Sequence, residues 1–166
     1  YKNATNEPMI LMGYTEQQLI LAEGVVRGWI NGDDKTYYES AVKASFEFYR
    51  TYATDVAAYL SEDAAETYLQ GSEVVYDSTL STEQKIERIA MQKYLPTFLP
   101  GGVWLPYYDA LRTGYPDFRS ASGVQLPYRW MYPQSEYNNN AANVQAALDN
   151  QFGGGDKTTD KPWWLQ

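Results

Sequence analysis

The chain of 166 residues has the length of one ordinary domain, which is enough to bury a hydrophobic core. Its 13 basic residues against 21 acidic ones give a formal charge of −8, and this argues against a nucleic-acid binder because phosphate contacts need a basic face. The sequence has neither Cys nor His, which excludes disulfides, thiolate nucleophiles, the usual zinc sites and Ser-His-Asp chemistry.

Two helices are predicted in the first 52 residues. Thr15 followed by Gln18 is typical of a capping box, and apolar residues then recur at helical spacing up to a natural stop at Asn31-Gly32. Asp33 or Asp34 then caps a second helix. Because the connection is short, we expect the two helices to pack antiparallel, as in helical-hairpin repeats.

An acidic stretch follows, over residues 55–77, with six acidic and no basic side chains. Such charge runs usually form a solvated surface, so we expect a short helix over 55–68 and then an irregular loop. The alternative is a loop that helps to form a ligand surface, because loops on rigid scaffolds often carry binding sites. Tyr59, Tyr68 and Tyr76 lie in or beside this stretch.

The rest of the chain also reads as helices and loops. Ser81 begins a helix that Pro96 ends or kinks, and a further helix is predicted over 103–112. The last helix is predicted over 141–148, and the glycines at 153–155 serve as a flexible exit to the C-terminal tail. No strand pattern is present in the sequence, so we expect a mainly α fold with long ordered loops.

A catalytic pair of carboxylates remains possible, since glycosidases need only two acids at a set separation. With 21 acidic residues in the chain, such a pair carries little information. The candidate carboxylates are Glu16, Glu23, Asp109 and Glu136.

Glu23 falls beside the apolar stripe of the first predicted helix. A half-buried carboxylate there needs a partner, and Arg112 is the partner that we expect. A structural ion pair is favoured over a catalytic Glu23.

Four tryptophans admit two interpretations, because an indole ring fits the apolar face of a pyranose but also fills a core around irregular loops. For Trp104 and Trp130 the core is favoured. The pair Trp163-Trp164 would be a very apolar exposed end, so we expect this tail to dock on the body of the protein.

Six short motifs follow one another along the chain, from about Leu11 to Trp164. They are Leu21-Ala22-Glu23 with Gly28, Tyr38 with Val42–Ser45, Glu83-Gln84 with Ile89 and Gln92–Tyr94, Trp104 with Leu111–Pro116, Leu126–Arg129 with Tyr132–Glu136 and Asn143, and Trp163-Trp164. Together these motifs resemble, in order, those of SusD/RagB-like outer-membrane nutrient-binding lipoproteins. Leu111 and Tyr94 depart from the family pattern, which usually has Arg and Trp there.

This resemblance implies one SusD-like helical domain over 1–166, built on hairpins related to tetratricopeptide repeats. Family members are much longer and start with a lipoprotein signal and an acylated Cys, so the chain is expected to be a C-terminal portion. It would sit at the outer membrane, exposed on the cell surface, with membrane contact only through a lipid anchor on the missing part. The implied partner is a SusC-like TonB-dependent transporter, with no nucleic acid.

The implied function is non-enzymatic capture of a glycan or another nutrient for import, without a cofactor or a metal. The shared motifs are packing residues, so no ligand contact carries over, and the local candidates for sugar contacts are Tyr68 and Tyr76. Two alternatives stay open: a helical interaction module that docks the transporter without touching ligand, and a glycan hydrolase fragment that uses paired acids.

Overall fold

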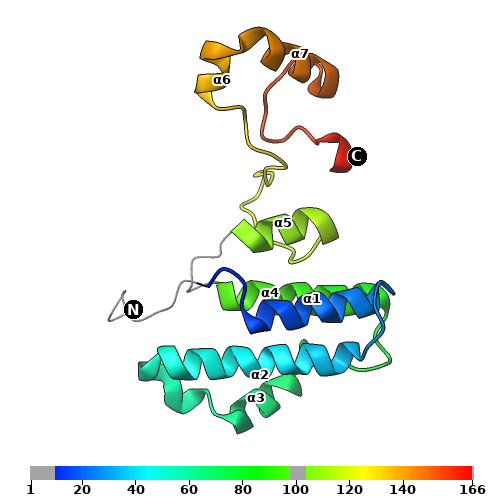
Figure 1. Ribbon diagram of the computed structural model, residues 1–166, viewed down its shortest axis with the longest axis vertical. Coiled ribbons are helices and arrows are strands. Elements are labelled where there is room, and N and C mark those ends of the chain that lie inside the picture. The colour runs from blue at the N-terminus through cyan, green and yellow to red at the C-terminus, as the bar shows by residue number, and fades with distance from the viewer. Residues whose placement is uncertain (1–9, 98–103, 166) are drawn as a thin grey trace. The chain divides into compact units, whose positions relative to one another are not determined.

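The computed structural model describes residues 10–97 and 104–165. Within these ranges every regular element is a helix, which confirms the mainly α class. The structure forms two compact units, Tyr1–Pro116 and Asp117–Gln166, where the sequence analysis expects one domain (Figure 1). None of the described helices has the length and apolar composition needed to cross a membrane.

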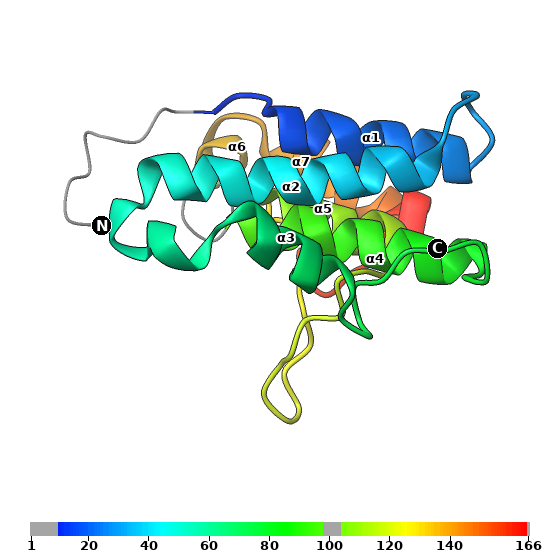
Figure 2. The ribbon, with the colours of Figure 1, turned by 90° about the horizontal axis from the view of Figure 1, so that it is seen from below.

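The first unit is built on a helical hairpin. Helices α1 and α2 lie side by side and antiparallel, α4 packs against α1, and α3 packs against α2 (Figures 1 and 2). The elements of this unit are α1 (Tyr14–Val26), α2 (Asp34–Tyr52), the 3₁₀ helix η1 (Thr54–Tyr59), α3 (Glu62–Leu69), α4 (Thr82–Tyr94), the 3₁₀ helix η2 (Leu95–Thr97) and α5 (Trp104–Thr113).

Side-chain caps fix where two of these helices begin. Asp33 accepts hydrogen bonds from the backbone N–H of Lys35 at 3.1 Å and of Thr36 at 3.3 Å, and so caps α2 as the sequence predicts. Ser81 and Gln84 form a capping box at the start of α4, where each side chain accepts from the backbone N–H of the other residue.

Both ends of α1 differ from the prediction. The helix begins at Tyr14 after Gly13, with no side-chain cap, so the expected capping box at Thr15 is wrong. It ends at Val26, before the expected stop at Asn31-Gly32, because Gly28 takes the left-handed backbone conformation, at φ 71°, and turns the chain. The N–H of Gly28 donates to Val25 O at 2.9 Å and closes the turn.

The core of the first unit joins the hairpin to the loop that follows α3. Tyr38, on α2, is fully buried and its hydroxyl donates to Val74 O at 2.9 Å. The other buried members of this core are Leu19, Ala22, Ala41, Val42, Leu69, Val74, Tyr76 and Ile89. The acidic stretch is therefore not wholly a solvated excursion, because its last part supplies side chains to the core.

The second unit is held together around one carboxylate. Asp156 pairs with Arg129 at 2.5 Å and accepts hydrogen bonds from the backbone N–H of Tyr132 at 2.9 Å and from the hydroxyl of Tyr137 at 2.6 Å. Arg129 also lies over the Phe152 ring, 4.5 Å from its centroid. The elements of this unit are α6 (Gln134–Asn139), α7 (Ala141–Phe152) and the 3₁₀ helix η3 (Trp163–Leu165), of which α6 is absent from the sequence prediction.

The glycine-rich segment after α7 is a fixed turn and not the flexible exit that the sequence predicts. Gly153 and Gly154 adopt left-handed conformations, at φ 69° and 93°, and the N–H of Gly154 donates to Leu148 O at 3.1 Å. The turn places Asp156 against Arg129, since it directs the chain back along the unit. Glycine is used here because other residues are strained at positive φ.

Gly154→Ala should lower the free energy of unfolding of the second unit by about 1–2 kcal/mol. The backbone is left-handed there, and an added Cβ would lie 2.9 Å from Asp149 Oδ1. Gly155→Ala is the matched control, because its Cβ would meet nothing closer than 3.9 Å. Thermal unfolding measures both variants, and equal stability of the two would contradict a turn that depends on the conformation of Gly154.

Candidate functional site

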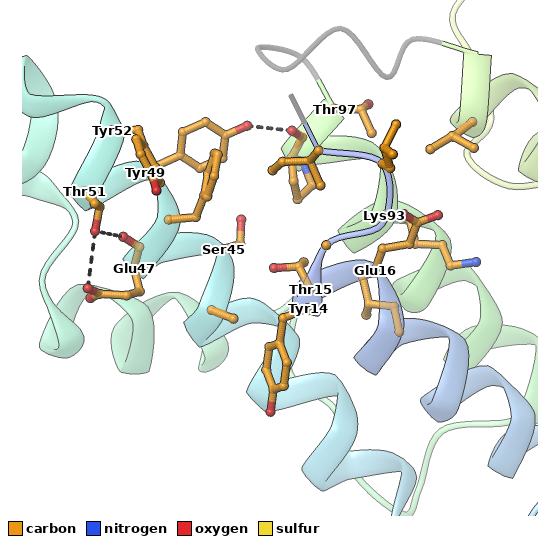
Figure 3. Close-up of a pocket in the computed structure, with 18 of the residues that line it drawn as sticks. Tyr14, Thr15, Glu16, Ser45, Glu47, Tyr49, Thr51, Tyr52, Lys93 and Thr97 are labelled. Atoms are coloured by element: carbon orange, nitrogen blue, oxygen red, sulfur yellow. Dashed lines mark hydrogen bonds between the residues drawn. The ribbon is translucent and has the colours of Figure 1, made fainter. Parts of the chain in front are cut away.

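A pocket of about 510 Å³ opens within the first unit (Figure 3). Its walls are the start of α1, the second half of α2, the end of α4 with η2, and α5. Its volume lies in the range of about 300–1,000 Å³ that is usual for small-molecule sites. This pocket is the candidate ligand site.

Aromatic and aliphatic side chains form most of the pocket wall. On α2 the contributing positions recur at helical spacing and continue, beyond the core, the face that buries Tyr38. Tyr49 is held in place by donating its hydroxyl to Pro96 O at 2.6 Å (Figure 3). The apolar lining includes Ile10, Leu11, Tyr14, Leu19, Ala44, Phe48, Tyr49, Tyr52, Pro96 and Leu105.

Polar groups also reach the pocket, from several helices. Thr15 and Glu16 enter from α1, and Asp109 from α5. Lys93, from α4, lies 3.4 Å from Asp109 and 3.5 Å from Glu23, so the charge of this cation is already balanced. A pocket with aromatic walls and a few polar groups suits a ligand that has apolar faces and hydroxyl edges.

The ion pair expected between Glu23 and Arg112 is present, as part of a larger network that includes the pocket residues Lys93 and Asp109. Arg112 Nη2 donates to Glu23 Oε2 at 2.9 Å, and Arg27 Nε donates to Glu23 Oε1 at 2.7 Å. Arg112 also bonds Asp109 at 2.7 Å, so α1, α4 and α5 are joined through charged side chains. Glu23 is 5% exposed.

The network controls the ionisation of Glu23. Burial by itself would raise the pKa of this carboxyl, but hydrogen bonds from Arg112 and Arg27 and the nearby charge of Lys93 outweigh burial and lower the pKa to about 2. Glu23 is therefore a carboxylate at neutral pH and fully engaged by cations, which is the arrangement of a structural group.

The four candidate carboxylates are distributed over different environments. Glu16 and Asp109 line the pocket, whereas Glu23 takes part in the network and is not among the lining residues. Glu136 belongs to α6 in the second unit. Because Asp109 is itself bonded to Arg112, the structure gives this set no feature of a dedicated acid-base pair.

Tyr76 lies in the hydrophobic core and not on a ligand surface. It is 2% exposed, its ring stacks on Tyr38 with centroids 4.5 Å apart, and its hydroxyl donates to Asp34 at 2.9 Å. Lys85 Nζ also lies over this ring, 5.4 Å from its centroid. The expected sugar contact at Tyr76 is not supported by this position, because the ring has no open face.

Tyr68 lies on α3 and not on a loop. Its ring packs at 5.4 Å from that of Phe46, and its hydroxyl accepts a hydrogen bond from Gln92 Nε2 at 2.9 Å. It borders the core and does not line the pocket. The sequence favoured these two tyrosines because they lie beside an interrupted helix, a signal that does not distinguish core from surface.

The tryptophans are more exposed than the sequence analysis expects. Trp104 and Trp130, for which a core position is favoured, are 54% and 55% exposed, and the tail residues Trp163 and Trp164 are 74% and 53% exposed. Apolar composition alone does not predict burial, because folded proteins keep much apolar surface in contact with water.

The sequence predicts the pocket residues on α2 as part of an apolar stripe and carries no signal that marks them as a site. Phe48, Tyr49 and Tyr52 continue the spacing of Tyr38 along the helix. Periodicity shows that these positions share one face of α2, but it does not show that α1 leaves this part of the face uncovered.

Comparisons with known proteins give consistent matches. The family model SusD-like_2, described as starch-binding associating with outer membrane, matches residues 1–133. A solved outer membrane protein from Bacteroides vulgatus ATCC 8482, inferred to take part in nutrient binding, is 76% identical with a TM-score of 0.89, over 97% of this chain and 35% of that one. A search of the curated proteins finds no match.

Two further solved structures extend these matches. A SusD homologue from Bacteroides fragilis NCTC 9343 is 54% identical with a TM-score of 0.89, over 97% of this chain and 36% of that one. A chitin-binding protein is 30% identical with a TM-score of 0.70, over 92% of this chain and 32% of that one. The chain therefore spans about a third of the length of these solved relatives.

Proposed function

The chain belongs to the SusD-like family of outer-membrane nutrient-binding proteins, and from this membership we propose that it captures a glycan at the cell surface. In this proposal it acts without catalysis, as the binding subunit of an importer whose channel is a SusC-like TonB-dependent transporter. The pocket between α1, α2 and α5 contributes to the ligand surface.

The observation that carries the proposal is the aromatic wall of this pocket. Tyr14, Tyr49 and Tyr52 present flat rings with hydroxyl edges, which match the alternation of apolar faces and hydroxyl groups on a sugar. The likeness to a chitin-binding protein supports a glycan over other nutrients. A neutral glycan is favoured, because the pocket cation Lys93 is already paired.

Electrophoresis of the full-length protein in native gels that contain a panel of polysaccharides tests the proposal. Slower migration without release of reducing ends is the expected result. Release of reducing ends would instead favour the hydrolase alternative. Unchanged migration on every glycan, with co-purification of a barrel protein, would favour a module that docks the transporter only.

Tyr52→Ala should weaken glycan binding by about tenfold, because it removes one ring of the pocket wall at a cost of about 1.4 kcal/mol. Tyr52 is 42% exposed, so the substitution should leave the fold intact. Tyr59→Ala is the matched control, since Tyr59 is 78% exposed and lies outside the pocket. Titration calorimetry measures both variants, and equal affinity for the two would place the glycan elsewhere.

A further inference from the structure

A second hollow, of about 750 Å³, lies along α2 beside the first pocket. It is lined by α2, by η1, by the start of α3 and by Tyr14 of α1. Three residues, Tyr14, Ala44 and Glu47, line both this hollow and the first pocket, so the two adjoin along a shared border. Both belong to the first unit.

The shared border offers a surface on which a ligand could rest. Tyr14 is 59% exposed at the start of α1, and Ala44 contributes only a methyl group from α2. A small residue between two hollows leaves room for a ligand to pass, and an exposed ring beside it supplies a face for stacking. Glu47 already accepts a hydrogen bond from Arg50, and the remaining lone pairs of its carboxylate can accept from hydroxyl groups.

The basic side chains of the second hollow are paired, like Lys93 in the first. Lys43 Nζ lies 2.5 Å from Glu66, and Arg50 Nε donates to Glu47 at 2.9 Å. An acidic ligand would have to compete with these carboxylates for its cation. The electrostatics of both hollows therefore favour a neutral ligand.

We infer that the ligand is a linear, neutral oligosaccharide that extends from the pocket across Tyr14 into the second hollow. This inference rests on the proposed function and adds the shape of the ligand to it. A chain that fills both hollows makes more contacts than a disaccharide, which binds in the first pocket alone, so affinity should increase with the number of sugar units until both hollows are filled.

Binding to malto- and chito-oligosaccharides, from disaccharide to heptasaccharide, tests this by calorimetry on the full-length protein. We expect the longest chains of the preferred series to bind at least about tenfold more tightly than the disaccharide. Ala58→Trp, in η1, fills the second hollow only and should abolish this gain while the disaccharide affinity stays unchanged. Val56→Trp is the matched control, because Val56 lies on the same helix, is exposed and lines neither hollow.

The outcomes separate the inference from the proposed function. Affinity that does not change with chain length, or a gain that Ala58→Trp leaves intact while thermal unfolding shows a folded variant, overturns the extended site and leaves glycan capture standing. Absence of binding to every oligosaccharide of both series overturns the proposed function and the inference together.

Discussion

Tyr76→Ala is expected to lower the free energy of unfolding of the first unit by about 3–5 kcal/mol, the usual cost of truncating a buried aromatic side chain. The ring is 2% exposed and stacks on Tyr38, so its removal leaves a cavity in the core. The change also removes a hydrogen bond to Asp34. The midpoint of urea unfolding measures the loss.

Two further variants separate packing from any part in ligand binding. Tyr76→Phe keeps the ring and should cost about 1–2 kcal/mol for the lost hydrogen bond to a carboxylate. Because the ring faces the core, glycan affinity of this variant should equal that of the unchanged protein. Tyr59→Ala, at an exposed position, should alter stability by less than about 0.5 kcal/mol. A Tyr76→Phe protein of normal stability but much weaker glycan binding would contradict the core assignment.

Glu23→Gln is expected to cost about 2–3 kcal/mol, because it leaves Arg112, Arg27 and Lys93 without the carboxylate that balances them. This expected loss is no greater than the lower limit usual for removing one partner of a buried ion pair, because Arg112 is 43% exposed and therefore partly hydrated. Thermal unfolding measures the loss. Glu87→Gln is the matched control, as an exposed acidic position on α4.

The same network predicts how stability depends on pH. The pKa of Glu23 is lowered from 4.5 to about 2 in the folded chain, so its contribution is fully present above about pH 4.5 and is lost as the pH falls toward 2. The acid-induced loss of stability should therefore be smaller in Glu23→Gln than in the unchanged protein. Parallel pH profiles for the two proteins would show that Glu23 does not carry this dependence.

Local sequence signals predicted the positions of most helices. Asp33 and Ser81 carry side chains that satisfy the first backbone N–H groups of α2 and α4, and this chemistry depends only on neighbouring residues. The start of α1 was misplaced because Thr15 looks like a cap in the sequence while the helix already begins at Tyr14. Helix α6 was missed because six residues are too few to establish a periodicity.

The candidate site was less accessible to sequence reasoning. The pairing of Glu23 with Arg112 was expected from a carboxylate beside an apolar stripe, but the parts played by Arg27, Lys93 and Asp109 were not. The tyrosine pair chosen for ligand contacts borders or fills the core, whereas the pocket uses residues assigned to a helix face. Exposure depends on which neighbouring helix covers a residue.

By itself the sequence determined the helical class, the hairpin connection and the family, because capping, periodicity and short motifs are read over a few neighbouring residues. Only the tertiary structure decided that Tyr76 is buried while Tyr52 borders a pocket, and that the turn at Gly154 brings Asp156 to Arg129. The physical reason is that burial and charge pairing arise from residues far apart in the chain, whose approach is set by how the helices pack and where each one ends.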